Sequence, residues 1–270
     1  MVKLKGCGLG LRREFLQDVI PSGFKPDFWE VTPENWIHMP YHHKEVFEQV
    51  VLDNKTVAHG LSLSIGGDKR PSKKFLKTIK TFLDKYNIED YSEHISFSSL
   101  MGKQTYELLP LPLTKKMVNL VSDRVKYIED FLGRSLILEN ATYYYVPDAK
   151  MSEVEFINEL VHKSGVRLLL DVNNVYVNSI NHNFDAKQFI NDLDKSTVAY
   201  MHLAGHFDDK DLGLLIDSHG MDVKDDVWSL FEHTLKKVKA PTMIERDNNI
   251  PPLKQMIKEY KKLKKIYKDA

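Results

Sequence analysis

The residues best suited to chemistry are concentrated in two short stretches, His202-Leu203-Ala204-Gly205-His206 and Asp217-Ser218-His219-Gly220. Side chains alternate along an extended segment, so Asp217 and His219 can project to the same face. Imidazole together with carboxylate suits iron, zinc or manganese rather than calcium. Taken alone, the two stretches are equally compatible with a metal site and with a solvated loop carrying incidental histidines.

Further potential ligands follow apolar runs elsewhere in the chain. Leu136-Ile137-Leu138, for example, runs directly into Glu139, and Val198 to Met201 runs into His202. Six runs in succession end in such a residue: His59, His94, Glu139, Asp171, His202 and Glu245. A single histidine at a strand end is more often structural, but six in succession are hard to attribute to chance.

The elements that would position these residues alternate between strand and helix. Short runs, most of them apolar, at 6–11, 28–31, 56–58, 91–94, 135–138, 167–170, 198–201 and 241–244 are predicted strands. Amphipathic stretches after them predict helices near 13–20, 43–52, 72–86, 114–131, from 152, at 185–193, at 225–238 and from 251. Eight such units predict one α/β domain over residues 1–270, a TIM-type (β/α)8 barrel.

A doubly wound open sheet is the alternative fold. Its phosphate-binding turn is absent after the first strand, because Gly6, Gly8 and Gly10 have the wrong spacing for it. We interpret these glycines as a tight rim of the barrel. The segment 98–112 reads as an insertion.

In a TIM barrel the carboxyl ends of all strands meet at one rim, where catalytic residues gather. The six strand-end residues should therefore converge there, joined by Asp217 and His219. Eight ligands exceed what one ion holds at four to six coordination, so the set indicates two or three ions bridged by carboxylates. Glu139 and Asp171 are the preferred bridges.

The remaining candidates are assigned less specific roles. We expect surface or outer-sphere positions for one group of residues: Glu30, Glu34, His38, His42, His43, His162 and His233. Phe184 and the run Tyr143-Tyr144-Tyr145 are expected to form core and pocket wall.

Composition excludes some classes of partner. The chain has 270 residues, 42% of them apolar, and 38 basic residues balance 38 acidic ones. Such a balance argues against a nucleic-acid partner. The basic run Lys254–Lys268 has helical spacing and is expected to be the solvated face of a helix. Cys7 is the only cysteine, and no run approaches membrane-spanning length. We expect a cytoplasmic protein without a membrane partner.

Several motifs together resemble the multinuclear non-heme iron-dependent oxidative enzymes, a family that includes the methanobactin biosynthesis oxygenase. The resemblance extends from about Gly6 to Pro252. It rests on Gly8-Leu9-Gly10-Leu11-Arg12, Pro33-Glu34-Asn35-Trp36, His59-Gly60-Leu61-Ser62-Leu63-Ser64, Ser92-Glu93-His94, Glu139-Asn140, Asp171-Val172-Asn173-Asn174-Val175-Tyr176, Asn181-His182, and the two stretches named first. Ser218 stands where many relatives have threonine, and Asn183 where glycine is usual; asparagine also tolerates a left-handed backbone.

The resemblance implies a TIM-like barrel that holds two or three irons, in mixed ferrous and ferric states, with dioxygen as oxidant. Known members modify a residue, usually cysteine, of a ribosomally made precursor peptide, often with a small partner protein that captures the leader. The implied iron ligands are His59, His94, Glu139, Asp171, His202, Asp217, His219 and Glu245. Asn173, His182 and His206 would support them, with His206 in either an outer-sphere or a substrate-facing role, and Asp217 and His219 would serve the most labile position.

Three alternatives remain open from the sequence. Arg12 either pairs with a substrate carboxylate or forms a structural ion pair. A barrel with this set of ligands also suits a divalent-metal hydrolase or isomerase of the sugar-isomerase and abasic-endonuclease type. A metal-storing or scaffold protein is the non-enzymatic alternative.

Overall fold

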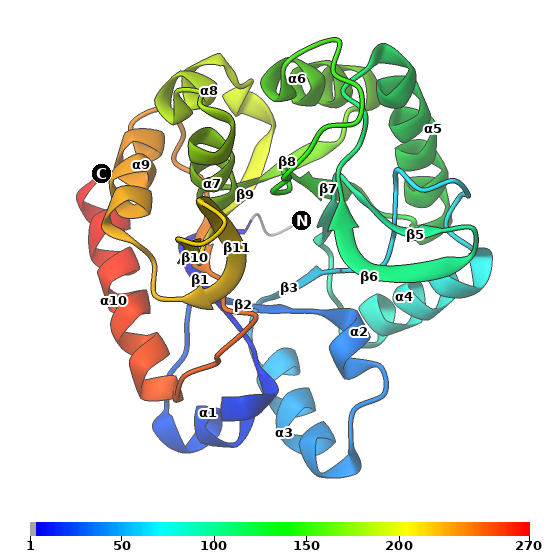
Figure 1. Ribbon diagram of the computed structural model, residues 1–270. Coiled ribbons are helices and arrows are strands. Elements are labelled where there is room, and N and C mark those ends of the chain that lie inside the picture. Colours follow the sequence, from blue (N-terminus) through cyan, green and yellow to red (C-terminus); the bar gives the residue numbers. More distant parts are fainter. Residues whose placement is uncertain (1–3) are drawn as a thin grey trace.

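The computed structural model describes residues 4–270 and shows eight parallel strands closed into a barrel surrounded by helices (Figure 1). The strand order around the barrel is β1-β12-β9-β8-β7-β4-β3-β2. These strands are β1 (Cys7–Gly10), β2 (Phe28–Val31), β3 (Thr56–His59), β4 (Tyr91–His94), β7 (Leu136–Glu139), β8 (Arg167–Asp171), β9 (Val198–Leu203) and β12 (Thr242–Ile244). The predicted TIM-type barrel is confirmed, and all eight predicted runs form its strands.

The helices pack their apolar sides onto the outer face of the barrel. The longer ones are α1 (Leu16–Ser22), α3 (Tyr41–Leu52), α4 (Lys73–Lys85), α5 (Lys115–Leu132), α6 (Glu153–Ser164), α7 (Val172–His182), α8 (Ala186–Asp192), α9 (Asp225–Leu235) and α10 (Leu253–Asp269). Short turns complete the set: α2 (Pro33–Trp36), η1 (Arg13–Phe15) and η2 (Lys195–Thr197). None of the helices between residues 4 and 270 combines the length and apolar composition that crossing a bilayer requires.

Helix α7 differs from the sequence prediction, which placed no helix between Asp171 and Asp185. The Asp171 side chain caps α7 by accepting a hydrogen bond from the backbone N–H of Asn174 at 2.6 Å. At the other end Asn183 has φ of 55°, the left-handed conformation expected of it. Strand β8 therefore passes into a helix without a loop, and this fixes the side chains of the first helical turn.

Two hairpins lie at the carboxyl ends of the barrel strands and were not predicted. The insertion forms β5 (Phe97–Leu100) and β6 (Lys103–Leu109), and the loop after β9 forms β10 (Gly205–Asp209) and β11 (Leu214–Met221). Figure 1 shows them on opposite sides of the barrel opening. Asp217 and His219 are therefore held on β11, the extended segment expected for them.

The barrel interior is built in layers because side chains alternate along each strand. One layer is apolar and consists of Phe28, Val57, Ile137, Leu169, Tyr200 and Met243, with Leu4 below. Gly8 lies against it, and a Cβ there would be 2.4 Å from the Phe28 ring. The glycine thus makes room for an interior ring, which corrects its interpretation as part of a tight rim.

Candidate metal centre

A layer of polar side chains lies directly above the apolar layer. Nearly every member stands two residues after an apolar one, as Glu139 follows Ile137 and His202 follows Tyr200; His94, which follows Ser92, is the exception. The layer consists of Glu30, His59, His94, Glu139, Asp171, His202 and Glu245, all at most 9% exposed. The period of two along each strand thus aims all these groups at one enclosed volume.

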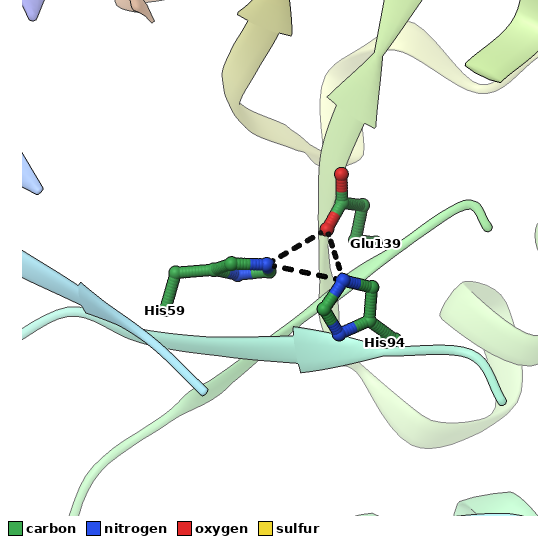
Figure 2. Close-up of side chains that lie close together, drawn as sticks. All are labelled: His59, His94 and Glu139. Carbon is green, nitrogen blue, oxygen red and sulfur yellow. Dashed lines mark hydrogen bonds and ion pairs between the residues drawn. The ribbon is translucent and has the colours of Figure 1, made fainter. Parts of the chain in front are cut away.

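The first group of candidate ligands comprises His59, His94 and Glu139 (Figure 2). Glu139 Oε2 lies 3.1 Å from His59 Nε2 and 3.2 Å from His94 Nε2. The two Nε2 atoms are 3.2 Å apart. Figure 2 shows the three atoms facing one point from β3, β4 and β7, the arrangement of three ligands around one small cation.

A second group shares Glu139 with the first and adds Asp171, His202 and Glu245. His202 Nδ1 lies 3.5 Å from Glu139 Oε1 and 2.9 Å from Glu245 Oε2. The two oxygens of Glu139 therefore face different groups. A carboxylate placed in this way could offer one oxygen to each of two cations.

A third group shares Glu245 with the second and adds His219 and Asp247. His219 Nδ1 lies 3.0 Å from Glu245 Oε2 and 3.3 Å from Asp247 Oδ2. On the other side of its ring, Nε2 lies 2.8 Å from Asp217 Oδ1. His219 has φ of 44°, a left-handed backbone that a non-glycine residue adopts at a cost and that is common at functional sites.

Positive charge in the layer keeps two of its carboxyl groups ionised. Burial opposes ionisation, but His59 and His94 hold the pKa of Glu139 well below its usual range, and His202 and His219 do the same for Glu245. Conversely, burial opposes protonation of His59, yet Glu139 raises the pKa of His59 to about 9. Burial raises the pKa of Asp171 well above its usual range. A cation supplies the same positive charge without protons.

The donor set fits a bound metal. Five buried atoms in the layer have no hydrogen-bond partner within residues 4–270: His94 Nδ1, Glu139 Oε1 and Oε2, Asp171 Oδ2 and His202 Nδ1. Buried polar atoms are almost always paired, so an orphaned set facing one volume calls for an explanation. Imidazole nitrogen and carboxylate oxygen are ligands of iron, zinc and manganese.

The layer opens to solvent through a cavity of about 470 Å³. Its floor includes the candidate ligands His94, Asp217, His219 and Glu245, and its wall is largely apolar: Leu61, Leu108, Tyr144, Leu214 and Ile216. Leu108 comes from β6, and Leu214 and Ile216 come from β11, so both hairpins line it. The cavity has the size and apolar wall of a small-ligand pocket.

Residues 6–268 match the protein family described as RiPP precursor modification enzyme MbnB/TglH/ChrH. The chain belongs to this family. RiPPs are ribosomally synthesised peptides that are modified after translation, so membership makes a precursor peptide the substrate class. The resemblance drawn from the motifs is confirmed.

Curated relatives in this family span nearly the whole chain. The UPF0276 protein of Acinetobacter baylyi is 42% identical over 265 residues, covering 98% of this chain and 92% of the relative. The UPF0276 protein of Shewanella sediminis is 44% identical, covering 93% and 91%. These names specify no reaction.

Solved structures share the barrel at low identity. A D-tagatose 3-epimerase-like protein has a TM-score of 0.63 at 13% identity, covering 98% of this chain and 97% of that one. Endonuclease IV from Thermus thermophilus has a TM-score of 0.60 at 12% identity, covering 98% and 100%. At this identity the likeness shows the fold alone.

The structure brings all eight predicted ligands of this family member together and places two of the three predicted supporting residues, Asn173 and His206, beside them. Asn173 Nδ2 donates to Asp217 Oδ1 at 2.9 Å, and Asn173 Oδ1 accepts from His206 Nδ1 at 2.8 Å. His182 lies further away, with Nε2 2.7 Å from the Tyr143 carbonyl.

Arg12 is buried and engaged by the chain itself. Its Nε donates to the Arg246 carbonyl at 2.5 Å, and one NH2 group donates to Asp247 Oδ1 at 2.6 Å. The same group lies 3.8 Å from Glu245 Oε1. These contacts are those of the structural ion pair, the second of the two alternatives for Arg12.

Sequence reasoning missed one residue of the site and left the place of another open. Glu30 was expected at the surface or in the outer sphere, and the structure buries it in the layer beside His202, which is the outer-sphere alternative. Its position after Phe28 follows the same period of two as the ligands, which was the available signal. Asp247 lies beyond β12 and is brought to His219 by its ion pair with Arg12, which no local pattern indicates.

Proposed function

We propose that the chain is an iron-dependent oxidase or oxygenase that uses dioxygen to modify a cysteine residue of a ribosomally synthesised precursor peptide. It would hold two or three irons in mixed ferrous and ferric states, act in the cytoplasm, and receive its peptide from a small leader-binding partner. The observation that carries the proposal is the sharing of two glutamates, Glu139 and Glu245, among three successive groups of ligands. Sharing of this kind suits a multinuclear centre.

The chain's own residues would divide the work between holding metal and facing substrate. His59, His94, Glu139, Asp171, His202, Asp217, His219 and Glu245 would hold the metal, with Asp247 as a further candidate beside His219. Bound iron would supply the redox chemistry and would favour the thiolate form of a substrate cysteine. Asp217 is the most accessible of the eight, with 17% of its side chain exposed, so its end of the centre faces incoming substrate.

The cavity would admit one side chain and exclude most water. Leu61, Leu214 and Ile216 present apolar surface beside the ligands, and the Tyr144 hydroxyl accepts a hydrogen bond from the backbone N–H of Asp217 at 3.0 Å. A substrate residue held there is fixed beside the metal ligands, which converts an encounter into an oriented reaction. The peptide on either side would lie between the two hairpins.

The test is metal analysis of anaerobically purified protein combined with oxygen uptake. The peptide probe is the short cysteine-containing product of a reading frame beside this gene, with a cysteine-to-serine version as control. We expect iron in the protein, oxygen uptake only with the cysteine peptide, and a mass change on that peptide.

Other outcomes would support the alternatives. Zinc or manganese with anaerobic turnover of a sugar or a nucleic acid would indicate the hydrolase or isomerase. Bound metal with no turnover of any probe would indicate storage. Either result would overturn the proposal.

A further inference from the structure

Beneath the ligands, three buried side chains connect His59 to His202 through hydrogen bonds. Ser92 Oγ lies 2.8 Å from His59 Nδ1 and 2.6 Å from the hydroxyl of Tyr200. Tyr200 donates to Glu30 Oε2 at 2.8 Å, and His202 Nε2 lies 2.9 Å from the same oxygen. The path joins a histidine of the first group of ligands to a histidine of the second.

Every member of this path is shielded from water. Ser92, Tyr200 and His202 are 0% exposed, and Glu30 and His59 are 1% exposed. A buried polar group that loses its partner has no water to replace it, so each contact in the path has to be kept. Such a path specifies the position of every proton in it.

The proton positions follow from the acceptor at the end. Glu30 as a carboxylate only accepts, so Tyr200 and the Nε2–H of His202 both donate to it. Tyr200 has a single O–H, and this O–H is directed at Glu30 Oε2 at 2.8 Å. The Ser92 hydroxyl has two acceptors in reach, the Tyr200 oxygen at 2.6 Å and the Ala58 carbonyl at 3.2 Å. Because Tyr200 already donates its proton to Glu30, Ser92 donates along the shorter contact to Tyr200 and accepts from the Nδ1–H of His59.

The opposite ring nitrogens are left to face the ligand groups. His59 presents Nε2, which lies 3.1 Å from Glu139 Oε2. His202 presents Nδ1, which lies 2.9 Å from Glu245 Oε2. A hydrogen bond at one imidazole nitrogen sets which nitrogen can bind metal.

We propose that Glu30, Tyr200 and Ser92 are positioning residues that lock His59 and His202 as opposite tautomers, so that His59 binds metal through Nε2 and His202 through Nδ1. This inference rests on the metal centre of the proposed function but requires neither iron nor oxygen. Glu30 also places a negative charge behind His202, which strengthens that imidazole as a ligand.

The direct test uses zinc, which is diamagnetic, in protein labelled with ¹⁵N at histidine. Two-dimensional NMR distinguishes a protonated from a metal-bound ring nitrogen, and spectra of His59→Gln and His202→Gln assign the two rings. We expect His59 to carry its proton on Nδ1 and His202 on Nε2. Either ring bound through the other nitrogen would overturn the inference while leaving the peptide-oxidation proposal intact. Failure of zinc to bind at all would count against the metal centre itself.

Two variants test whether Glu30 and Tyr200 orient the histidine ligands or only stabilise the fold. Glu30→Gln keeps the shape and removes the charge, so we expect zinc affinity to fall about 10–100-fold, as when other outer partners of metal ligands are changed. Tyr200→Phe leaves the Glu30–His202 contact in place, so the His202 signals should stay as in wild type while those of His59 change. Tyr200→Phe also provides a second test of the inference if Glu30→Gln folds poorly.

Tyr260→Phe is the matched control. Tyr260 is buried on α10, and its hydroxyl accepts from the backbone N–H of Asp27 at 3.3 Å, away from the centre. We expect Tyr260→Phe to lower the melting temperature and to leave the zinc affinity and both histidine tautomers unchanged. If Glu30→Gln and Tyr200→Phe behave in the same way as this control, their role is structural and the inference fails.

Discussion

Glu139 is the residue on which the first two groups of ligands depend, because its two oxygens face different groups. Glu139→Gln preserves volume but removes the charge that a bridge between cations needs. We expect one fewer iron per chain and negligible peptide oxidation, with cooperative folding retained. Iron quantitation and a thermal melt measure these effects. Glu153→Gln, a carboxylate change outside the layer, should keep the full iron content.

The opposite pattern would assign Glu139 a different role. If the variant melts at a lower temperature with an unchanged iron count, Glu139 is an ion-pair partner of the histidines and bridges nothing.

His206 acts on the centre through Asn173, since Asn173 bonds both His206 and Asp217. Burial lowers the pKa of His206, which favours the neutral ring stacked on Tyr176 at 5.4 Å. His206→Ala frees Asn173 to turn, so Asp217 loses its fixed orientation. We expect iron affinity at the His219 end to fall about 10–100-fold, measured by titration against a chelator.

His182→Ala is the control for that measurement. This histidine also lies near the barrel opening and bonds a carbonyl, that of Tyr143, but it contacts no ligand of the centre in the described chain. Equal iron affinities for the two variants would show that the Asn173 link has no effect on the centre.

At the scale of elements, the barrel strands were more predictable than the segments that connect them. The six polar residues at the strand ends, from His59 to Glu245, were predictable because most of them follow one rule. Under this rule the polar residue stands two places after an apolar residue that points into the barrel. Helix α7 escaped prediction because Asn173, Asn174 and Asn178 have modest helix propensity. They remain helical because each side chain bonds neighbouring backbone or the ligand Asp217. Tertiary contacts of this kind leave no periodic signal.

The start of α6 packs against α7 and predicts a dependence of stability on pH. Burial raises the pKa of Glu153 to about 8, against hydrogen bonds from Tyr143 and Asn178 that lower it. A folded-state pKa above the usual 4.5 means that this group's stabilising contribution is present below about pH 4.5 and is lost as the pH rises through about 8. Glu153→Gln stays neutral throughout.

We therefore expect metal-free Glu153→Gln to gain melting temperature relative to wild type as the pH rises from about 5 to about 9, by a few degrees. Metal-free protein is used because metal binding has its own pH dependence. A difference between the two proteins that stays constant over this range would contradict the assignment of the shift to Glu153.

At the scale of the whole molecule, the centre joins strands that are far apart in the chain. Its candidate ligands run from His59 on β3 to Glu245 beyond β12, and the parallel strands bring them to one end of the barrel. The apolar layer below supplies packing without any metal. We infer that the barrel forms without metal and that metal binding adds stability at the end where charges are concentrated.

Removing the metal should therefore lower the melting temperature without unfolding the protein. A ligand that binds only the folded state, present at about a hundred times its dissociation constant, adds about 2.7 kcal/mol to the free energy of unfolding. For a domain of this size, each kcal/mol of unfolding free energy shifts the melting temperature by roughly 2–4 °C. Ferrous iron added anaerobically to protein stripped of metal by a chelator should therefore raise the melting temperature by about 5–10 °C per site. Glu139→Gln should show a smaller rise, because two groups lose their shared ligand. Calcium, which prefers oxygen ligands, serves as the control and should leave the melt unchanged. Identical melting temperatures with and without iron would mean that protonated histidines alone balance the carboxylates of the layer. The shared glutamates would then stabilise the fold and bind no metal.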